Sequence, residues 1–139
     1  MGVYGMSEIQ GMLCLRGLDE PPETRELGGG TLVAAEARVR ARDTVTGEIL
    51  AHGKSGELEF KVPSVMTGYY GNAEATAAAF TADGYLRSGD LGYTTADNAF
   101  VYQSRMGDAL RLSGFMVNPL EIEAVLDSHP SIAASQVVG

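Results

Sequence analysis

The chain has 139 residues, 45% of them hydrophobic, which is enough for one ordinary domain and argues against global disorder. Its net charge of −8 argues against binding to nucleic acid or to an anionic membrane surface, because both need clustered Lys and Arg. Cys14 is the only cysteine, and its apolar neighbours predict a buried thiol rather than a nucleophile. We expect no signal peptide and no membrane span, since no apolar run approaches about 18 residues, and therefore a cytoplasmic protein.

The first half of the chain predicts short strands separated by loops. The apolar run 12–15 has the length of a strand, and residues 18–30 (LDEPPETRELGGG) are expected to form a surface loop. Charged residues at every second position of 36–42 (EARVRAR) predict a half-buried strand whose arginines face solvent. The cleanest alternation is in 56–62 (GELEFKV), which predicts a strand that Pro63 ends.

Helical and strand patterns follow each other in the second half. The Ala-rich residues 73–80 predict a short helix with Asn72 as its N-cap. Residues 99–105 (AFVYQSR) predict another strand, and 108–119 (DALRLSGFMVNP) predict a hairpin. The pattern of 120–130 (LEIEAVLDSHP) predicts a helix closed by its proline.

The last segment, 132–139, predicts a final strand. The change from strands and turns to a hairpin, a helix and a strand indicates a boundary near 103–108. The expected fold class is therefore mainly β with short helices in 1–104, and α+β in 105–139.

One stretch carries a question of its own. Residues 84–92 (GYLRSGDLG) place Asp90 between glycines, just after a strand-like run. Taken alone, this pattern is typical of a tight turn, because Asp and Gly are among the commonest turn residues.

Four segments recur in a fixed order, and together they resemble the adenylate-forming, AMP-binding enzymes. They are 4–8 (YGMSE), 56–76 (GELEFKVPSVMTGYYGNAEAT), 84–92 (GYLRSGDLG) and 104–126 (SRMGDALRLSGFMVNPLEIEAVL). This superfamily includes acyl- and aryl-CoA synthetases, adenylation domains of nonribosomal peptide synthetases, and beetle luciferases. The resemblance implies that 1–104 is the end of a large N-terminal domain, folded as a distorted barrel-like subdomain. It implies that 105–139 is the beginning of a mobile C-terminal lid domain.

The resemblance also implies a reaction in two halves. A small-molecule carboxylic acid attacks the α-phosphate of ATP and yields an acyl-adenylate and pyrophosphate. The thiol of CoA then displaces AMP. The implied cofactors are ATP, Mg²⁺ and CoA.

The same resemblance assigns roles around the nucleotide. Tyr4, followed by Gly5, would lie against the adenine ring, and Ser7 would hydrogen-bond the α-phosphate. Glu8 would hold Mg²⁺, which prefers carboxylate oxygen. Asp90 would accept both ribose hydroxyls on its two oxygens, presented by the glycine-flanked turn.

Further roles follow towards the end of the chain. Arg105 would reach ribose and phosphate just before the hinge, which would comprise Gly107 and Asp108. Gly114 would lie beside the CoA pantetheine tunnel, although a plain hairpin glycine explains it nearly as well. Residues 65–72 (VMTGYYGN) are expected to support the substrate pocket by packing, without taking part in chemistry.

The chain departs from the family pattern in several places. Gly107 stands where the family usually has Asp or Lys, and Arg111 stands where CoA ligases commonly have Lys. The glycine-rich phosphate loop is missing, and the only lysines, Lys54 and Lys61, precede the hinge, so the catalytic lysine is missing too. We therefore expect an internal fragment of a ligase that is itself inactive.

Several functions remain as alternatives. Residues 117–123 (VNPLEIE) favour an acyl- or aryl-CoA ligase over a peptide-synthetase adenylation domain, and a fatty-acyl-AMP ligase is a further alternative. A different class is a non-catalytic nucleotide-binding or interaction module. An unrelated acidic β-domain would require four ordered motifs to match by chance.

Overall fold

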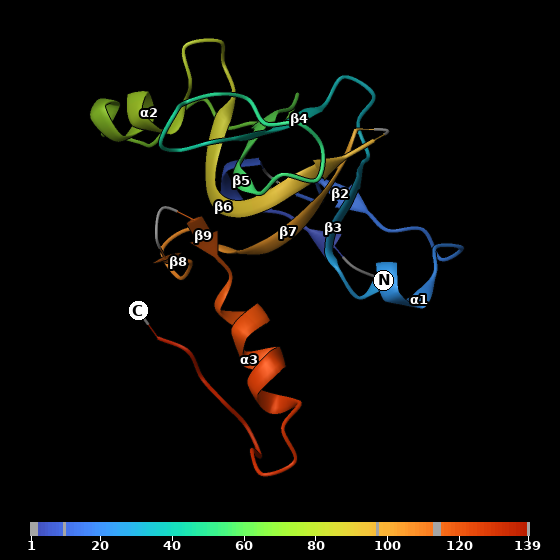
Figure 1. Cartoon of the computed structure of the whole chain (residues 1–139). Coiled ribbons are helices and arrows are strands. Elements are labelled where there is room, and N and C mark those ends of the chain that lie inside the picture. The colour runs from blue at the N-terminus through green and yellow to red at the C-terminus, as the bar shows by residue number, and fades with distance from the viewer. Residues whose placement is uncertain (1–2, 10, 97, 113–114, 139) are drawn as a thin grey trace.

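The computed structural model describes residues 3–9, 11–96, 98–112 and 115–138. Short strands dominate it, with helices at intervals (Figure 1). In chain order the elements are β1 (Val3–Tyr4), the 3-10 helix η1 (Ser7–Ile9), β2 (Cys14–Leu15), α1 (Pro22–Arg25), β3 (Gly28–Leu32), β4 (Arg38–Arg42), β5 (Gly56–Lys61), α2 (Ala73–Ala79), β6 (Leu86–Thr95), β7 (Ala99–Arg105), β8 (Leu110–Leu112), β9 (Phe115–Val117) and α3 (Pro119–Asp127).

Strands β1 to β7 form one antiparallel sheet in the order β1-β2-β3-β7-β6-β5-β4. The sheet is strongly curved, and β6 bends visibly through its middle (Figure 1). The curvature carries the β1 edge over the centre of the sheet, so that the Tyr4 ring on β1 lies 5.7 Å from the Phe60 ring on β5. The predicted barrel-like, mainly β fold is confirmed.

The concave side of the sheet holds the core. Its buried side chains come from six of the seven strands and from the segments between them. Each Å² of apolar surface that they remove from water stabilises the fold by roughly 25 cal/mol. They are Ile9, Leu13, Cys14, Leu32, Ala37, Ala41, Leu58, Phe60, Val62, Leu86 and Phe100. Strands β5 and β7 lie where the alternation predicted them, and the Cys14 thiol is buried and free, as expected.

The loop predicted over 18–30 is partly wrong. This segment contains α1, and its glycines form the first three residues of β3. A Cβ on Gly29 would lie 2.4 Å from the Phe100 carbonyl oxygen, and one on Gly30 would lie 2.5 Å from that of Leu15. The glycine run therefore allows close backbone packing between strands instead of a flexible loop.

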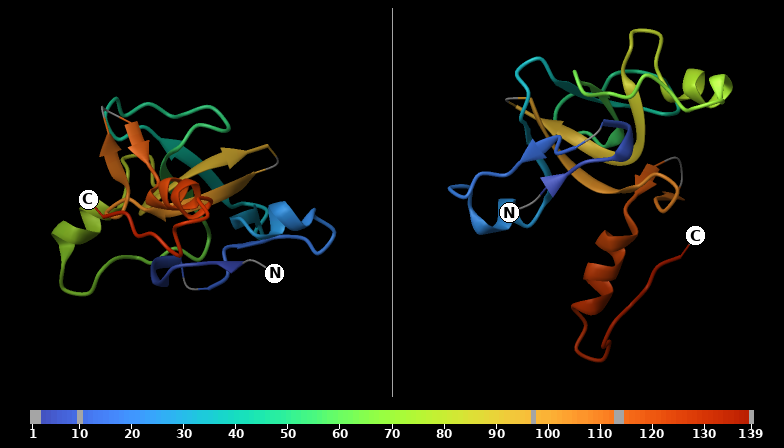
Figure 2. Two further views of the ribbon diagram at one scale, coloured as in Figure 1. Left: turned by 60° about the horizontal axis from the view of Figure 1, so that its bottom comes forward. Right: turned by 180° about the vertical axis from the view of Figure 1, so that it is seen from behind.

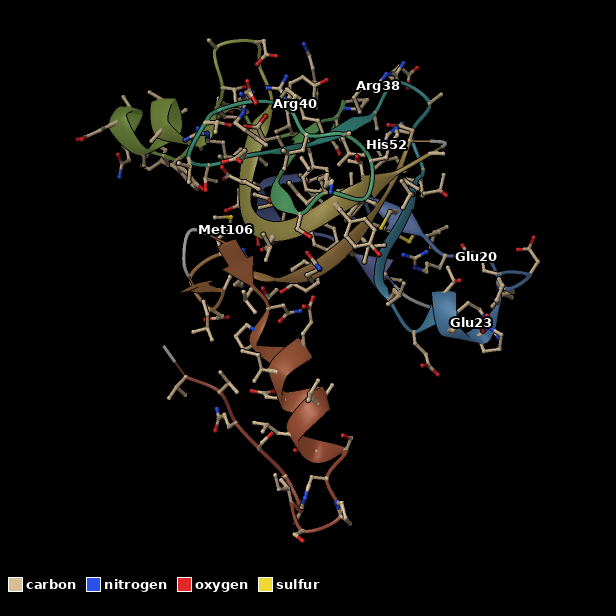
Figure 3. The ribbon with its side chains drawn as sticks, viewed as in Figure 1. Glu20, Glu23, Arg38, Arg40, His52 and Met106 are labelled. Carbon is tan, nitrogen blue, oxygen red and sulfur yellow. The ribbon has the colours of Figure 1, made fainter. Side chains whose placement is uncertain are left out.

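The prediction that the arginines of β4 face solvent is wrong for two of them. Arg40 Nε lies 2.5 Å and Arg42 Nε 2.7 Å from the carboxylate of Glu59, which is completely buried on β5. Arg40, labelled in Figure 3, also donates to Asp83, and its Cζ lies 3.8 Å from the centre of the Tyr85 ring. The polar face of this strand pair is thus covered by its own ion pairs.

Both longer helices form as predicted. The Asn72 side chain accepts a hydrogen bond from Ala75 N at the start of α2. The Asn118 side chain accepts one from Leu120 N at the start of α3. These bonds satisfy amide groups that the first helical turn leaves without a partner.

The end of the chain differs from the prediction. Residues 128–138 form no strand; they run back alongside α3, where Val137 N donates to Glu123 Oε1 at 2.8 Å. Helix α3 and this tail extend away from the large sheet (Figure 1 and right-hand view of Figure 2). A strand forms only where a neighbouring strand accepts and donates its backbone hydrogen bonds. The apolar pattern of this segment does not show whether such a neighbour exists, so the pattern alone could not predict its conformation.

The hairpin is confirmed as β8 paired with β9, from Leu110 opposite Val117 to Leu112 opposite Phe115. Its tip, including Gly114, lies outside the described residues. No helix within the described ranges is long and apolar enough to cross a membrane.

Candidate functional site

Asp90 lies inside strand β6 and not in a turn between two segments, which corrects the expectation drawn from its glycine neighbours. The bend is a bulge: residues 88–90 lie between the pairs Glu57–Leu91 and Glu59–Arg87, opposite a single residue of β5. Gly89 has φ +68°, a left-handed conformation that favours glycine. Bulges redirect side chains locally, and this one directs Asp90 towards β1 and β7.

Two side chains hold the Asp90 carboxylate. The Tyr4 hydroxyl donates a hydrogen bond to Oδ2, and Arg105 Nη1 lies 3.0 Å from Oδ1. The pair with Arg105 is an ion pair without hydrogen-bond geometry, because Oδ1 has no hydrogen-bond partner among the described residues. Asp90 is only 2% exposed, so one oxygen of a buried carboxylate is left without a hydrogen bond.

The backbone around Asp90 is fixed by a serine. Ser88 Oγ donates to the Leu58 carbonyl at 2.6 Å and accepts a hydrogen bond from Asp90 N at 3.0 Å. Ser88 thus ties the bulge to β5. Its role was not predicted, and the sequence gives no signal for it beyond the Ser-Gly-Asp order.

The environment of Asp90 acts on its charge in opposite directions. Burial raises the pKa of its carboxyl, while the Tyr4 hydrogen bond and the positive charge of Arg105 lower it and the charge of Glu8 raises it. Burial and the bond to Asp90 also raise the pKa of Tyr4, so the tyrosine remains a donor. An ionised Asp90 therefore depends on its two partners.

The Tyr4 ring lies in a cage of aromatic rings. Its centroid is 5.7 Å from Phe60, 5.1 Å from Phe100 and 5.7 Å from Tyr102. The ring is thus part of the core, and its hydroxyl points to Asp90. Stacking on adenine stays a prediction.

Gly5, which follows, permits a close loop contact, because a Cβ there would lie 2.4 Å from the Gly11 carbonyl oxygen. Ser7 is exposed and is the first residue of η1.

Glu8 is held by the segment that was expected only to pack. The Tyr69 hydroxyl donates to Glu8 Oε1 at 3.0 Å, and Met66 N donates to the Glu8 carbonyl at 2.6 Å. The Glu8 bond raises the pKa of Tyr69. The contact of Tyr69 with Glu8 was not predicted, although the pair Tyr69-Tyr70 in a glycine-rich stretch was a usable signal.

Glu8 has the chemistry of a Mg²⁺ ligand, since this ion commonly takes one or two protein carboxylates and completes its shell with water and phosphate. No group of three or more His, Cys, Asp or Glu side chains in the described part is arranged to hold a metal ion by itself. A metal at Glu8 would thus need oxygens from a bound phosphate.

The residues after β7 are joined to the bulge. Met106 N donates to the Gly89 carbonyl at 2.8 Å, and the amides of Asp108 and Ala109 donate to the Arg105 carbonyl at 3.0 and 3.1 Å (Met106 labelled in Figure 3). Gly107 is exposed, with open space around its Cβ position.

A groove of about 680 Å³ opens here between the end of β7, the start of α3 and the tail. Arg105, Gly107 and Asp108 line this groove, whereas Tyr4, Glu8 and Asp90 do not. Tyr4 and Arg105 both contact Asp90, and the charge of Glu8 acts on the same carboxyl.

No protein-family model matches the chain, but it is similar to several known proteins. The chain is 38% identical over 135 residues to 4-coumarate–CoA ligase-like 6 of Oryza sativa subsp. japonica, covering 97% of the chain and 22% of that protein. It is 35% identical over 136 residues to 4-coumarate–CoA ligase of Pinus taeda, covering 97% and 25%.

Two solved structures share the fold. ATP-bound MatB from Rhodopseudomonas palustris is 32% identical with a TM-score of 0.81, over 99% of this chain and 26% of that one. MenE, an O-succinylbenzoate–CoA synthetase from Bacillus subtilis in complex with AMP, is 28% identical with a TM-score of 0.75, over 99% and 28%.

The fold and these relatives define the class: adenylate-forming enzymes. Within this class, the chain belongs to the AMP-forming, acyl- and aryl-CoA synthetase-like family. It spans about a quarter of the length of the relatives that it matches.

Proposed function

We propose that this chain is a nucleotide-binding part of an ATP-dependent ligase that activates a carboxylic acid as an acyl-adenylate and transfers it to CoA. The observation that carries the proposal is the buried Asp90 carboxylate, whose Oδ1 has no hydrogen bond to a described residue and lies 3.0 Å from Arg105 Nη1. A buried acceptor without a donor costs free energy, and a ribose hydroxyl would remove that cost.

The residues around Asp90 have complementary chemistry for the first half-reaction. The Arg105 guanidinium, 57% exposed, would bind oxygen atoms of ribose and phosphate. Ser7 offers a hydroxyl for the α-phosphate, and Glu8 would hold Mg²⁺. Such an ion offsets the negative charge that develops on phosphate oxygens during displacement.

The remaining parts of the proposal concern the whole enzyme. We assign CoA as the acceptor, with Gly114 beside it, and an aryl or fatty acid as the substrate. The division is at the hinge, with 1–104 ending the AMP-binding domain and 105–139 beginning the lid domain. A cytoplasmic location fits one free, buried cysteine.

Binding to the chain itself tests the site. AMP is titrated into the ¹⁵N-labelled 139-residue chain, and we expect shift changes at residues 88–92 and 104–108. Asp90→Asn should weaken binding about tenfold to hundredfold, the effect of losing a charged hydrogen bond. Glu74→Gln, which removes an exposed charge on α2, is the control and should bind as wild type. Shift changes absent from 88–92 at saturating AMP would contradict the proposal.

Activity is tested in a chimera in which this chain replaces the matching segment of MatB. We expect ATP–pyrophosphate exchange that depends on the carboxylic acid and falls about tenfold to hundredfold with Asp90→Asn. A folded chimera whose exchange is unaffected by Asp90→Asn would refute the role of this site.

A further inference from the structure

The hydroxyl of Tyr4 makes a hydrogen bond to Asp90 in addition to the packing of its aromatic ring. The Tyr4 ring is enclosed by Phe60, Phe100 and Tyr102, while its hydroxyl leaves this cage and donates to Asp90 Oδ2. A tyrosine fixed by three rings has little freedom left, so its hydroxyl has a defined position. A donor in a defined position orients the carboxylate that accepts from it.

The two oxygens of Asp90 are therefore not equivalent. Oδ2 is bound by Tyr4, and Oδ1 has only the ion pair with Arg105, without a hydrogen bond to a described residue. The carboxylate presents one acceptor instead of the two expected for two ribose hydroxyls.

We propose that Tyr4 is the positioning residue of Asp90: its hydroxyl holds Oδ2, so that Asp90 Oδ1 is left to receive a ribose hydroxyl of a bound nucleotide. This inference rests on the proposed nucleotide-binding function and adds to it. It gives Tyr4 a role through its hydroxyl, where stacking on adenine would use only its ring.

Other charged and titratable groups face the same carboxylate. Arg105 and Tyr102 lie on β7, and Glu8 lies on the η1 segment. Tyr4 and Arg105 lower the pKa of Asp90, and Glu8 raises it. Tyr102 belongs to the cage, and its hydroxyl makes no hydrogen bond to Asp90, which makes it the matched control.

The first test needs no nucleotide. The Asp90 carboxyl is titrated by ¹³C NMR in the full 139-residue chain. Tyr4→Phe keeps the ring and removes the donor, so the titration midpoint of Asp90 should rise. Tyr102→Phe also removes a phenol hydroxyl but should leave the midpoint unchanged, because the Tyr102 hydroxyl makes no hydrogen bond to Asp90. An unchanged midpoint in Tyr4→Phe, with an otherwise native spectrum, would overturn the positioning role.

The second test uses AMP and 2′,3′-dideoxy-AMP as probes. Wild type should prefer AMP, and Tyr4→Phe should lose about tenfold to hundredfold in AMP affinity and most of that preference. If Tyr4 acted by stacking alone, Tyr4→Phe would keep both the affinity for AMP and the preference for AMP over 2′,3′-dideoxy-AMP. In an Asp90→Asn background Tyr4→Phe should cost little more, because the two residues act as a unit.

The outcomes separate the two proposals. A raised Asp90 midpoint without AMP binding by wild type would refute the nucleotide function while supporting the positioning of the carboxylate. AMP binding with equal affinity in wild type and Tyr4→Phe would refute the role of the Tyr4 hydroxyl and leave the nucleotide function standing.

Discussion

Asp90 and Arg105 are Cα partners across strands β6 and β7, and their side chains form an ion pair of 3.0 Å over the buried end of the carboxylate. The two residues are 15 positions apart in the sequence, and the bulge at Gly89 directs one towards the other. Arg105 is also the last residue of β7, so the pair joins the candidate nucleotide site to the segment expected to act as the hinge.

The buried Asp90 should make stability depend on pH. Burial raises its pKa in the folded chain, so the folded state binds the proton more tightly than the unfolded chain. The resulting stability is fully present below the unfolded pKa of about 3.9 and is lost as the pH rises through the raised folded pKa. In Asp90→Asn the free energy of unfolding should no longer fall as the pH rises, and urea unfolding at a series of pH values from below about 3.9 upwards measures this.

Asp83 provides a control of opposite sign. Hydrogen bonds from Arg40 and Thr81 lower the pKa of Asp83, so its stabilising effect is present above the unfolded pKa and is lost as the pH falls. Asp83→Asn should therefore lessen the loss of stability in acid. If Asp90→Asn and Asp83→Asn changed the slope of unfolding free energy against pH in the same direction, the opposite pKa shifts assigned to the two carboxyls would be wrong.

The buried carboxylate of Glu59 should be indispensable to the sheet. It accepts hydrogen bonds from both Arg40 and Arg42 and is completely buried, so Glu59→Gln takes the anion from Arg42 and leaves Arg40 with Asp83 alone. We expect a loss of about 3–5 kcal/mol in the free energy of unfolding. Glu57→Gln should cost less than about 1 kcal/mol, because burial already raises the pKa of Glu57 and disfavours its charge. Chemical denaturation measures both; equal midpoints would disprove the distinction.

The glycines of β3 should tolerate no side chain. Gly30→Ala would place a Cβ 2.5 Å from the Leu15 carbonyl oxygen at φ +140°. Gly47, at φ +75° with open space around it, isolates the backbone cost, which is of order 1–3 kcal/mol. Gly30→Ala should lower the melting temperature more than Gly47→Ala does. It should also slow the recovery of the native signal during refolding. Comparable melting temperatures would show that strand β3 can move aside.

The chain should divide at the hinge. Helix α3 and the tail extend from the sheet (Figure 1). Leu120, Val125 and Leu126 are exposed on α3. Brief digestion with a nonspecific protease should cut first within 106–109 or 18–21, and hydrogen exchange should be slowest in β5, β6 and β7. First cuts inside β5 would argue against two units.

The 139-residue chain alone should not make acyl-CoA. Its only lysines are Lys54 and Lys61, and Lys61 Nζ donates to the Asp83 carbonyl at 3.1 Å, on the part of the sheet that carries the Arg40 pairs. A cation at the reacting phosphate commonly contributes two to three orders of magnitude in rate. A coupled assay with ATP, CoA and a panel of carboxylic acids should stay at background; pyrophosphate release that depends on an acid would refute this.

Elements with a local pattern were determined by the sequence alone. The alternation in β5, the strand β7, the capped helix α2 and the hairpin β8–β9 all follow from side-chain period and capping residues. Such signals act between neighbours in the chain, so they are readable without knowing the fold. The order of four motifs likewise identified the family.

Only the tertiary structure decided which distant residues meet. Nothing local shows that Glu59 is buried between two arginines, that the glycines of β3 pair with β7, or that Tyr4 donates to Asp90 across 86 positions. These contacts depend on strand order and on the bulge at Gly89, which together bring remote segments side by side. The type of each site residue was therefore readable from the chain, whereas its partners required the curved sheet, because cross-strand packing is set by register and not by sequence proximity.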